Sequence, residues 1–564
     1  MNPHFIPLIS IMVTSGVFLV LVKWCFLPHG RLPRFRVAYT RLRLRLRLHP
    51  GRGHASAPEL WLRWGRFAAF RSSSRSRYSL GFWARALHPY SHSIFLGRAH
   101  YRHGLRLPVD QHGIIVSPPR KGKSALLGSV ILRYPGPVLS TTTKADLFGN
   151  TSGIRSRVGP VQVFNPQGIG GVPSTFRWSP VDGCDDPATA IRRADSFANA
   201  VSMEGTDDKS FWADKSSSYL RGLFHAAALV GGDMRLVVQW ALGNAQGAED
   251  ILARAGATQW AAELGELRGE AQKTAATVRM VMSRALSFMT DPALALSVLP
   301  GESDGLSFPG FLSERGTLYM IADSRNDDSP LAPLFACLAS ELHYAAEMIG
   351  QSSPGGRLDP PLLMALDEVT QICPVPLPVW AADSGGKGIQ ILSVVHGQAQ
   401  RRTRWKQDGA RVIMDTAGVM IFLPGITDTD TLSMASQLCG QAALKEHGQD
   451  HHTRHDVMAP EMISRLPDWR ALVIRGGNAP VVAKMSRVWK TWPYRVAKYR
   501  RGLAAVLTPA PAALLHAVAV VRPVVAPDIT PDFEAEPVGG TFTDPFPGPA
   551  TGPDADDTEY PWSA

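Results

Sequence analysis

Cysteine is scarce in this chain, and its few cysteines are scattered. Among the 564 residues there are five cysteines, and none of them forms a CxxC pair. Such spacing excludes a CxxC zinc site and gives no sign of a disulfide framework. Unpaired thiols suit a reducing compartment such as the cytoplasm.

Acidic residues are almost missing from the first 109 positions. That segment holds 18 Lys and Arg residues against one acid, Glu59, whereas residues 523–564 hold nine acids and no Lys or Arg. The net charge of +11 therefore comes from the N-terminal part of the chain. From about Pro509 the sequence is rich in Pro and Ala and then acidic, so it buries too little apolar surface to fold. We expect residues 501–564 to be a disordered tail.

Basic residues are also missing before the first apolar run, which extends from Phe5 to Val22. Without them the run lacks the charged start of a secretory signal. It is long enough to span a hydrocarbon core of roughly 30 Å. Seven arginines follow between Arg31 and Arg47, which places the N-terminus outside and the bulk of the chain in the cytoplasm. We therefore expect a single-pass transmembrane helix within residues 1–30 and a basic juxtamembrane segment over residues 31–97.

A glycine is absent from the first position of an otherwise recognisable phosphate-binding loop. The apolar run Ile114 to Val116 leads into Ser-Pro-Pro-Arg-Lys-Gly-Lys-Ser, and an apolar stretch that predicts a helix follows. In such loops backbone N–H groups surround a polyphosphate, the Lys contacts the terminal phosphates and the Ser binds Mg²⁺. The predicted nucleotide-binding residues are Ser117, Pro118, Pro119, Arg120, Lys121, Gly122, Lys123, Ser124 and Ala125.

A second apolar run ends in two carboxylates far downstream. Residues 360–366 are typical of a buried parallel strand, and Asp367 and Glu368 follow them. In a nucleotide motor, Asp367 would hold the Mg²⁺ shell, and Glu368 would orient and deprotonate the attacking water. Alone, the pattern is equally consistent with a core strand that ends in solvated acids. Together with the phosphate loop, it favours an ATPase.

Strands and helices alternate in two stretches that a helical stretch separates. Strands are expected at 137–141, 161–164, 316–322, 388–395 and 418–423, and this alternation indicates a parallel, doubly wound sheet. From Asp182 to about Pro300 the residues are rich in Ala, Leu and Arg at helical spacing. The predicted fold is α/β: a P-loop ATPase domain split into residues 98–183 and 301–500, with an all-helical insertion domain over residues 184–300.

The order of these motifs resembles the coupling ATPases of type IV secretion and bacterial conjugation, the TraG/TraD-like family. The resemblance covers roughly residues 98–490. Besides the two motifs above it rests on Thr143 to Asp146, Phe164 to Pro166, Trp178 to Pro180, Phe211-Trp212, Pro424 to Asp428 and Met458 to Glu461. It implies a RecA-like motor that is anchored in the cell inner membrane, forms a homohexamer and uses ATP and Mg²⁺.

The resemblance also implies a substrate and further site residues. The substrate would be single-stranded DNA with an attached relaxase, delivered to the channel proteins of the secretion system and recognised by the helical insertion. Lys123, Glu368 and Gln400 are the predicted catalytic residues, with Ser124 and Asp367 as metal ligands. The residues predicted to lie next to the site are Lys144, Asp146, Lys387, His396 and Arg402.

Three departures from the family pattern bear on hydrolysis. Ser117 replaces a glycine, and His396 ends a strand where the family often has Gln. Lys387 stands alone before that strand, where the family often has two arginines. An arginine that reaches the nucleotide of a neighbouring subunit is therefore either missing or supplied by Arg401, Arg402 or Arg404. Three alternatives stay open: a receptor for secreted proteins, a non-hydrolysing membrane scaffold and a double-stranded DNA pump.

Overall fold

The computed structural model describes residue 48 and residues 52–201, 209–269, 272–299, 305–323, 329–445 and 452–507. The apolar segment at 5–22, most of the basic stretch after it and residues 508–564 of the predicted tail lie outside these ranges. Residues 501–507, which the sequence predicted to be disordered, instead form the end of helix α21 (Trp492–Leu507). Within the described ranges, every helix is too short or too polar to cross a bilayer.

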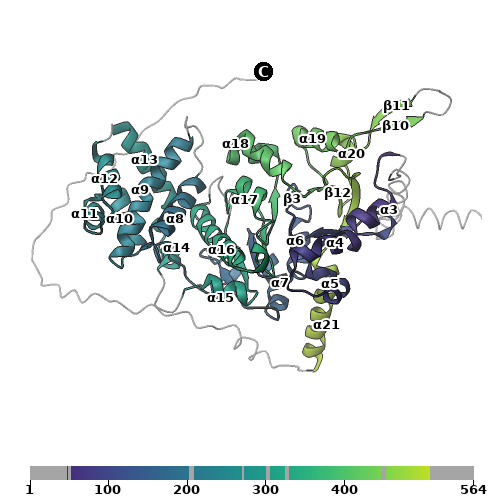
Figure 1. Cartoon of the computed structure of the whole chain (residues 1–564), viewed down its shortest axis with the longest axis horizontal. Helices are drawn as coiled ribbons and strands as arrows, with labels where there is room; N and C mark the ends of the chain where they lie inside the picture. The colour runs from purple at the N-terminus through teal and green to yellow at the C-terminus, as the bar shows by residue number, and fades with distance from the viewer. Residues whose placement is uncertain are drawn as a thin grey trace, which may run out of the picture. The chain divides into compact units, whose positions relative to one another are not determined.

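An 11-stranded sheet has the order β2-β1-β13-β12-β9-β3-β8-β7-β4-β6-β5 (Figure 1). Seven neighbouring strands pair in parallel, and four further strands extend the sheet antiparallel beyond β9. The parallel strands are β3 (Gly113–Val116), β4 (Val138–Thr142), β5 (Val161–Phe164), β6 (Thr317–Ile321), β7 (Leu362–Leu366), β8 (Ile389–Val395) and β9 (Val419–Phe422). The antiparallel strands are β1 (Ser93–Arg98), β2 (Gly104–Pro108), β12 (Arg470–Ile474) and β13 (Val481–Met485). The predicted α/β fold with a large parallel sheet is confirmed.

Helices cover both faces of the parallel strands, which explains why those strands are continuous apolar runs. All residues of β7 and β8 are buried. Along β3, Ile114 and Val116 join one core cluster and Ile115 joins the other, as the two-residue period of a strand requires. The helices of this domain are α6 (Lys123–Ile131), α7 (Asp146–Arg155), α15 (Phe308–Ser313), α16 (Ala332–Ser352), α17 (Leu377–Asp383), α18 (Gln398–Asp415), α19 (Thr429–Cys439), α20 (Pro460–Ser464) and α21 (Trp492–Leu507).

The domain built on the 11-stranded sheet begins earlier than the predicted start at residue 98. Helices α3 (Ala57–Glu59), α4 (Arg66–Ser76) and α5 (Phe82–Leu87) and most of β1 fall in the segment that was expected to be juxtamembrane. Leu60 and Trp64 are fully buried in the same core cluster as β1. Glu59 Oε1 accepts a hydrogen bond from the backbone N–H of Ala479, at 2.9 Å. The predicted boundary at 97/98 is therefore wrong, because residues 55–97 pack onto the antiparallel end of the sheet.

The stretch between β5 and β6 is helical. The described residues of 182–299 contain no strand, and their longer helices form a bundle (Figure 1). Asp186 caps the first helix by accepting hydrogen bonds from the backbone N–H groups of Ala188 and Thr189. The helices are α8 (Pro187–Ala200), α9 (Lys209–Leu229), α10 (Met234–Leu242), α11 (Gln246–Arg254), α12 (Thr258–Gly269), α13 (Gln272–Ala285) and α14 (Pro292–Ala295). Downstream, β10 (Gln441–Lys445) and β11 (His452–Asp456) form a separate hairpin.

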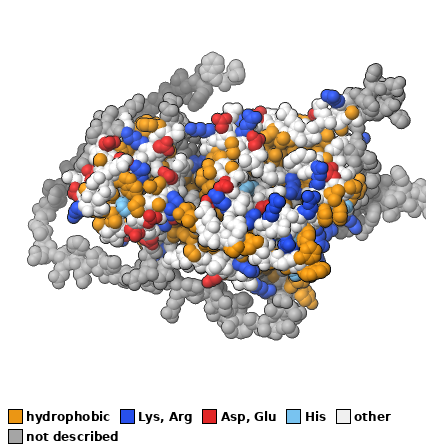
Figure 2. Space-filling model, viewed as in Figure 1, with side chains coloured by type: hydrophobic (Ala, Val, Ile, Leu, Met, Phe, Trp, Pro, Cys, Tyr) orange, Lys and Arg blue, Asp and Glu red, His pale blue; other side chains and the backbone are white. Residues whose placement is uncertain are grey.

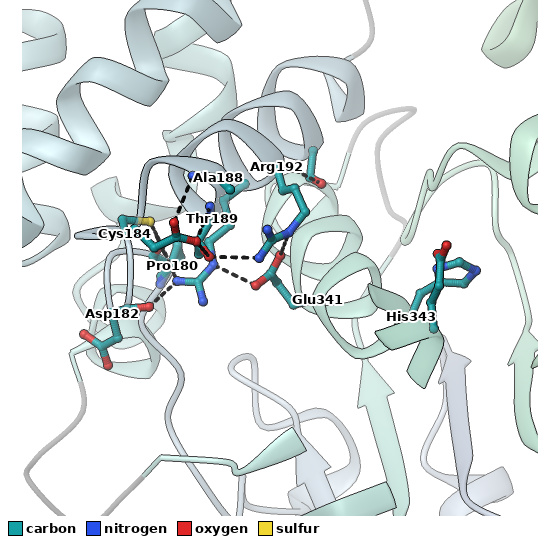
Figure 3. Close-up of polar contacts among 12 residues, drawn as sticks. Pro180, Asp182, Cys184, Ala188, Thr189, Arg192, Glu341 and His343 are labelled. Carbon is teal, nitrogen blue, oxygen red and sulfur yellow. Dashed lines mark hydrogen bonds and ion pairs between the residues drawn. The ribbon is translucent and has the colours of Figure 1, made fainter. Parts of the chain in front are cut away.

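A buried ion-pair network joins α8 of this bundle to α16 of the sheet domain. Arg192 Nε and Arg193 Nε lie 3.3 and 3.2 Å from the two carboxylate oxygens of Glu341 (Figure 3). Only 7% of the Glu341 side chain is exposed. Arg193 also donates a hydrogen bond to the Pro180 carbonyl, at 2.8 Å. Removing the shared carboxylate would leave buried guanidinium charge unpaired, so this contact fixes α8 to the sheet domain.

Candidate nucleotide site

Three parallel strands end side by side at one edge of the sheet, and their next residues carry the predicted chemistry. Val116 at the end of β3 is in register with Val395 at the end of β8. The end of β7 pairs with the same strand at Leu366. The phosphate loop, the acidic pair and His396 therefore meet at the carboxyl edge of the sheet, where parallel α/β proteins bind ligands.

The phosphate loop turns directly into helix α6. Gly122 precedes the helix with φ +93°, a conformation that favours glycine, and α6 then begins at Lys123. This arrangement points free backbone N–H groups and the positive end of the helix dipole at the loop. Ser117 is buried, its φ is outside the left-handed region, and its hydroxyl donates to the Pro118 carbonyl at 2.9 Å. A glycine is therefore not required at that position, which explains the departure from the usual motif.

The lysine and the two carboxylates of the site contact each other. Lys123 Nζ forms an ion pair with Glu368 and lies 3.4 Å from Asp367 Oδ1. Ser124 Oγ lies 3.4 Å from Asp367 Oδ2. The backbone of Glu368 adopts φ +52°, which is strained for a residue with a Cβ, and Thr141 Oγ1 donates to the Asp367 carbonyl at 2.8 Å. Two short motifs that are far apart in the sequence thus form one compact charged cluster.

Burial and charge act differently on the two carboxyl groups. Burial raises the pKa of Asp367, and the nearby Lys123 only partly offsets it. Burial also favours the neutral form of Glu368, but its hydrogen bond with His396 and the charge of Lys123 outweigh that effect and lower the pKa. Glu368 is therefore the carboxylate that stays ionised, as a proton acceptor must.

Asp367 and Ser124 fit a magnesium ion. Apart from the ion pair with Lys123 at 3.4 Å, the buried Asp367 Oδ1 has no hydrogen-bond partner among the described residues. Carboxylate and hydroxyl oxygens are the ligands that Mg²⁺ prefers, and it is commonly held by one or two of them together with substrate phosphates. A cation beside Asp367 would also lower the pKa of this carboxyl group and so counteract the effect of burial.

His396 is held between the acidic pair and the phosphate loop. Its Nε2 lies 2.7 Å from Glu368 Oε2, and its Nδ1 lies 2.8 Å from the Ser117 carbonyl oxygen. A carbonyl oxygen only accepts, and so does an ionised carboxylate, so both ring nitrogens carry protons. The hydrogen bond to Glu368 accordingly raises the pKa of His396. Gln400 is one contact farther away, with Oε1 3.4 Å from the His396 backbone nitrogen.

The remaining predicted residues lie at the periphery or away from the site. Lys144 and Asp146 are exposed beyond the end of β4, and Arg402 is exposed on α18. Lys387 precedes β8 and forms ion pairs with Glu347 and Asp383, so it lies at the amino edge of the sheet. Lys387 was predicted to lie next to the site, and within one subunit this prediction is wrong. The reason is that it stands before β8, whereas His396 stands after it.

One further neighbour of the loop, Trp469, was not predicted from the sequence. A Cβ added to Gly122 would lie only 2.7 Å from Cζ3 of the Trp469 ring. Next to it, Asp468 Oδ1 lies 3.8 Å from Lys121 Nζ in an exposed ion pair. These residues precede β12, which joins the sheet from its antiparallel side. No local pattern connects them with a loop so far away in the sequence.

Comparison with known proteins agrees with this architecture. Residues 361–468, which contain the acidic pair and His396, match the family model described as "TraM recognition site of TraD and TraG". The resemblance to the TraG/TraD-like coupling proteins is confirmed. No curated protein sequence matches this chain.

Solved coupling-protein structures share the fold. The plasmid coupling protein TrwB in complex with the non-hydrolysable GTP analogue GDPNP is 17% identical, with a TM-score of 0.52 over 68% of this chain and 87% of that chain. An unbound form of the bacterial conjugative coupling protein TrwBdeltaN70 is 18% identical, with a TM-score of 0.51 over 67% and 86%. TrwB in complex with ADP and Mg²⁺ is 17% identical, with a TM-score of 0.51 over 68% and 87%. At such low sequence identity, the similarity between this chain and these structures is a similarity of fold.

Proposed function

We propose that the protein is a Mg²⁺-dependent ATPase that couples DNA substrates to a type IV secretion channel during conjugative transfer. The observation that carries the ATPase is the convergence of Lys123, Ser124, Asp367 and Glu368 at one edge of the sheet. The match of residues 361–468 to the TraG/TraD family and the TrwB-like fold support the transfer function. The substrate would be relaxase-bound single-stranded DNA, and the motor would be a homohexamer.

The contacts of the site define a role for each side chain in hydrolysis. Lys123 moves from Glu368 to the β- and γ-phosphates of ATP. Ser124 and Asp367 would hold Mg²⁺, and a bound Mg²⁺ would neutralise charge on the phosphates. Glu368 accepts the proton of the water that attacks the γ-phosphate. His396 keeps Glu368 ionised and fixes its direction through the 2.7 Å hydrogen bond.

A membrane location is part of the proposal, and a surface beside β1 supports it. Trp61, Phe82 and Trp83 expose 54%, 55% and 74% of their surface. Exposed arginines lie among them on and around α4, and Figure 2 shows basic and hydrophobic side chains close together in this region. Aromatic and arginine side chains together are typical of membrane interfaces. We infer that residues 5–22 span the inner membrane once and that this surface faces it.

The test is the ATPase rate of the full chain in lipid nanodiscs, without DNA and with single-stranded or double-stranded DNA, over a salt series. We expect stimulation by single-stranded DNA that decreases as salt increases, because phosphate contacts are screened. Lys123→Ala should abolish turnover and ATP binding. Turnover that is indifferent to DNA would favour a receptor for secreted proteins, and ATP binding without turnover would favour a scaffold. Stronger stimulation by double-stranded DNA would favour a duplex pump.

A further inference from the structure

An aromatic cluster lies beside the phosphate loop and has no role in the hydrolysis described above. We call it the tryptophan cluster, and it consists of Trp469, Arg487 and Trp489. The guanidinium carbon of Arg487 lies 4.4 Å from the centre of the Trp469 ring. The Trp489 ring meets the Trp469 ring edge to face, with centroids 5.5 Å apart and an interplanar angle of 86°.

The cluster lies at the same sheet edge as the acidic pair. Because β12 runs antiparallel to β9, its first residue, Arg470, lies at the carboxyl edge of the parallel strands. Because β13 runs antiparallel to β12, its last residue, Met485, also lies there. Trp469 directly precedes the first of these positions, and Arg487 and Trp489 closely follow the second. Two segments that are distant in the sequence thus meet beside the phosphate loop.

The cluster contacts the loop and the helix that follows it. Trp469 packs so closely on Gly122 that a Cβ there would meet the ring at 2.7 Å. The short helix Val488–Lys490 packs along α6, where a Cβ on Gly128 would lie 3.2 Å from Val488 Cβ. Trp469 also holds a backbone φ of +63°, which is unusual for a bulky side chain, and strained residues of this kind cluster at active sites and ligand clamps.

The order of the strands sets the direction in which a nucleotide extends from the loop. Glu368 and His396 follow β7 and β8, on one side of β3, whereas the tryptophan cluster lies beyond β9, on the other side. A triphosphate whose terminal phosphate is at Lys123 and Glu368 therefore has its nucleoside directed away from β8. Trp489 is 40% exposed on that side, so an aromatic surface remains accessible there.

We propose that the tryptophan cluster is the base-binding part of the nucleotide site, where a purine stacks on the indole and guanidinium surfaces. This inference rests on the proposed nucleotide binding and adds the recognition of the base to it. Stacking on an aromatic ring or on an arginine plane stabilises any base, because every base has a π face. ATP and GTP should consequently gain the same affinity from it.

The test compares two ligands of the full chain, Mg²⁺–ATP and Mg²⁺–tripolyphosphate, by isothermal titration calorimetry. Tripolyphosphate carries the phosphates without the base. Trp489→Ala should weaken ATP binding about 5- to 150-fold, the range expected for loss of one base stack, and should leave tripolyphosphate binding unchanged. Trp489→Phe should retain most of the ATP affinity because the ring is kept. The matched control is Trp492→Ala, which removes an indole that is 74% exposed on α21 and outside the cluster.

The possible outcomes show whether Trp489 binds the base or only supports the structure of the phosphate loop. Equal weakening of both ligands in Trp489→Ala would show that the tryptophan only shapes the phosphate loop, and it would overturn the inference. Unchanged ATP binding in Trp489→Ala would overturn it as well. A wild-type chain that binds tripolyphosphate no more weakly than ATP would show that the base contributes nothing. Failure of the wild-type chain to bind either ligand would instead refute the nucleotide site, and this inference with it.

Discussion

Replacing Glu368 with Gln should change ATP affinity and ATP turnover in opposite directions. Lys123 Nζ is paired with Glu368, and the two side chains are only 12% and 11% exposed. ATP has to take Lys123 from this carboxylate, so the ion pair competes with phosphate binding. A hydrogen bond to a charged group contributes about 1.5–3 kcal/mol. We therefore expect Glu368→Gln to bind ATP about 10- to 150-fold more tightly than the wild-type chain.

Turnover by the same variant should fall because an amide does not accept the proton of the attacking water. A positioned general base contributes about 10²- to 10⁴-fold to a rate, so a loss of that size is expected for Glu368→Gln. Single-turnover measurements at saturating ATP separate this loss from product release. The variant should then accumulate as an ATP-bound complex that does not hydrolyse.

The control for this experiment is Glu347→Gln. It also removes a glutamate that is paired with a lysine, Lys387, but at the amino edge of the sheet. Its ATP affinity and turnover should equal those of the wild-type chain. Hydrolysis by Glu368→Gln at the wild-type rate would refute Glu368 as the base. An unchanged ATP affinity would refute the competition between Glu368 and phosphate for Lys123.

Three further predictions follow from other contacts. The hydrogen bond to Glu368 raises the pKa of His396 above its ordinary value of 6.5. The stability that protonated His396 contributes is therefore complete below pH 6.5 and is lost as pH rises through the raised pKa. Melting curves should accordingly show a larger difference between wild type and His396→Gln at pH 6 than at pH 8.5. Glu341→Ala should lower the free energy of unfolding by about 3–5 kcal/mol, because the buried Arg193 and the half-buried Arg192 lose the carboxylate that they share. Thermal denaturation should register the loss beside an unaffected Asp233→Asn control. Arg402→Ala should lower ATP turnover but not ATP binding in the assembled protein, and equal turnover would contradict a role between subunits.

The parallel part of the fold was readable from the sequence, and the antiparallel part was not. The predicted strands at 388–395 and 418–423 match β8 and β9 to within a residue at each end, since strands buried on both faces are continuous apolar runs. In β2 the apolar pattern is interrupted by Arg106, which is only 7% exposed. Its guanidinium carbon lies 4.5 Å from the centre of the Tyr90 ring. A basic residue at this position hides the strand in the sequence, because the run lacks the continuous apolar residues that marked the parallel strands.

The site was predictable where its chemistry follows a local motif. Lys123 and Ser124 belong to one short pattern, and Asp367 and Glu368 end one apolar strand. Trp469 could not be predicted from the sequence, because its contact with Gly122 depends on β12 returning antiparallel to the loop. The pairing of Lys123 with Glu368 likewise depends on the strand order, in which β8 separates β3 from β7.

The three arginines after His396 could not be distinguished from the sequence, but they differ in burial and in their partners. Arg401 is 1% exposed, and burial lowers its pKa to about 10, so it cannot act on a neighbouring subunit. Arg404 donates a hydrogen bond to the Asn199 carbonyl at the end of α8. Arg402 is 45% exposed and pairs with the exposed Asp430 at 3.2 Å, a contact of about 0–1 kcal/mol that is easily exchanged. Of the three arginines, Arg402 is therefore the one whose guanidinium can exchange its partner for a group on a neighbouring subunit.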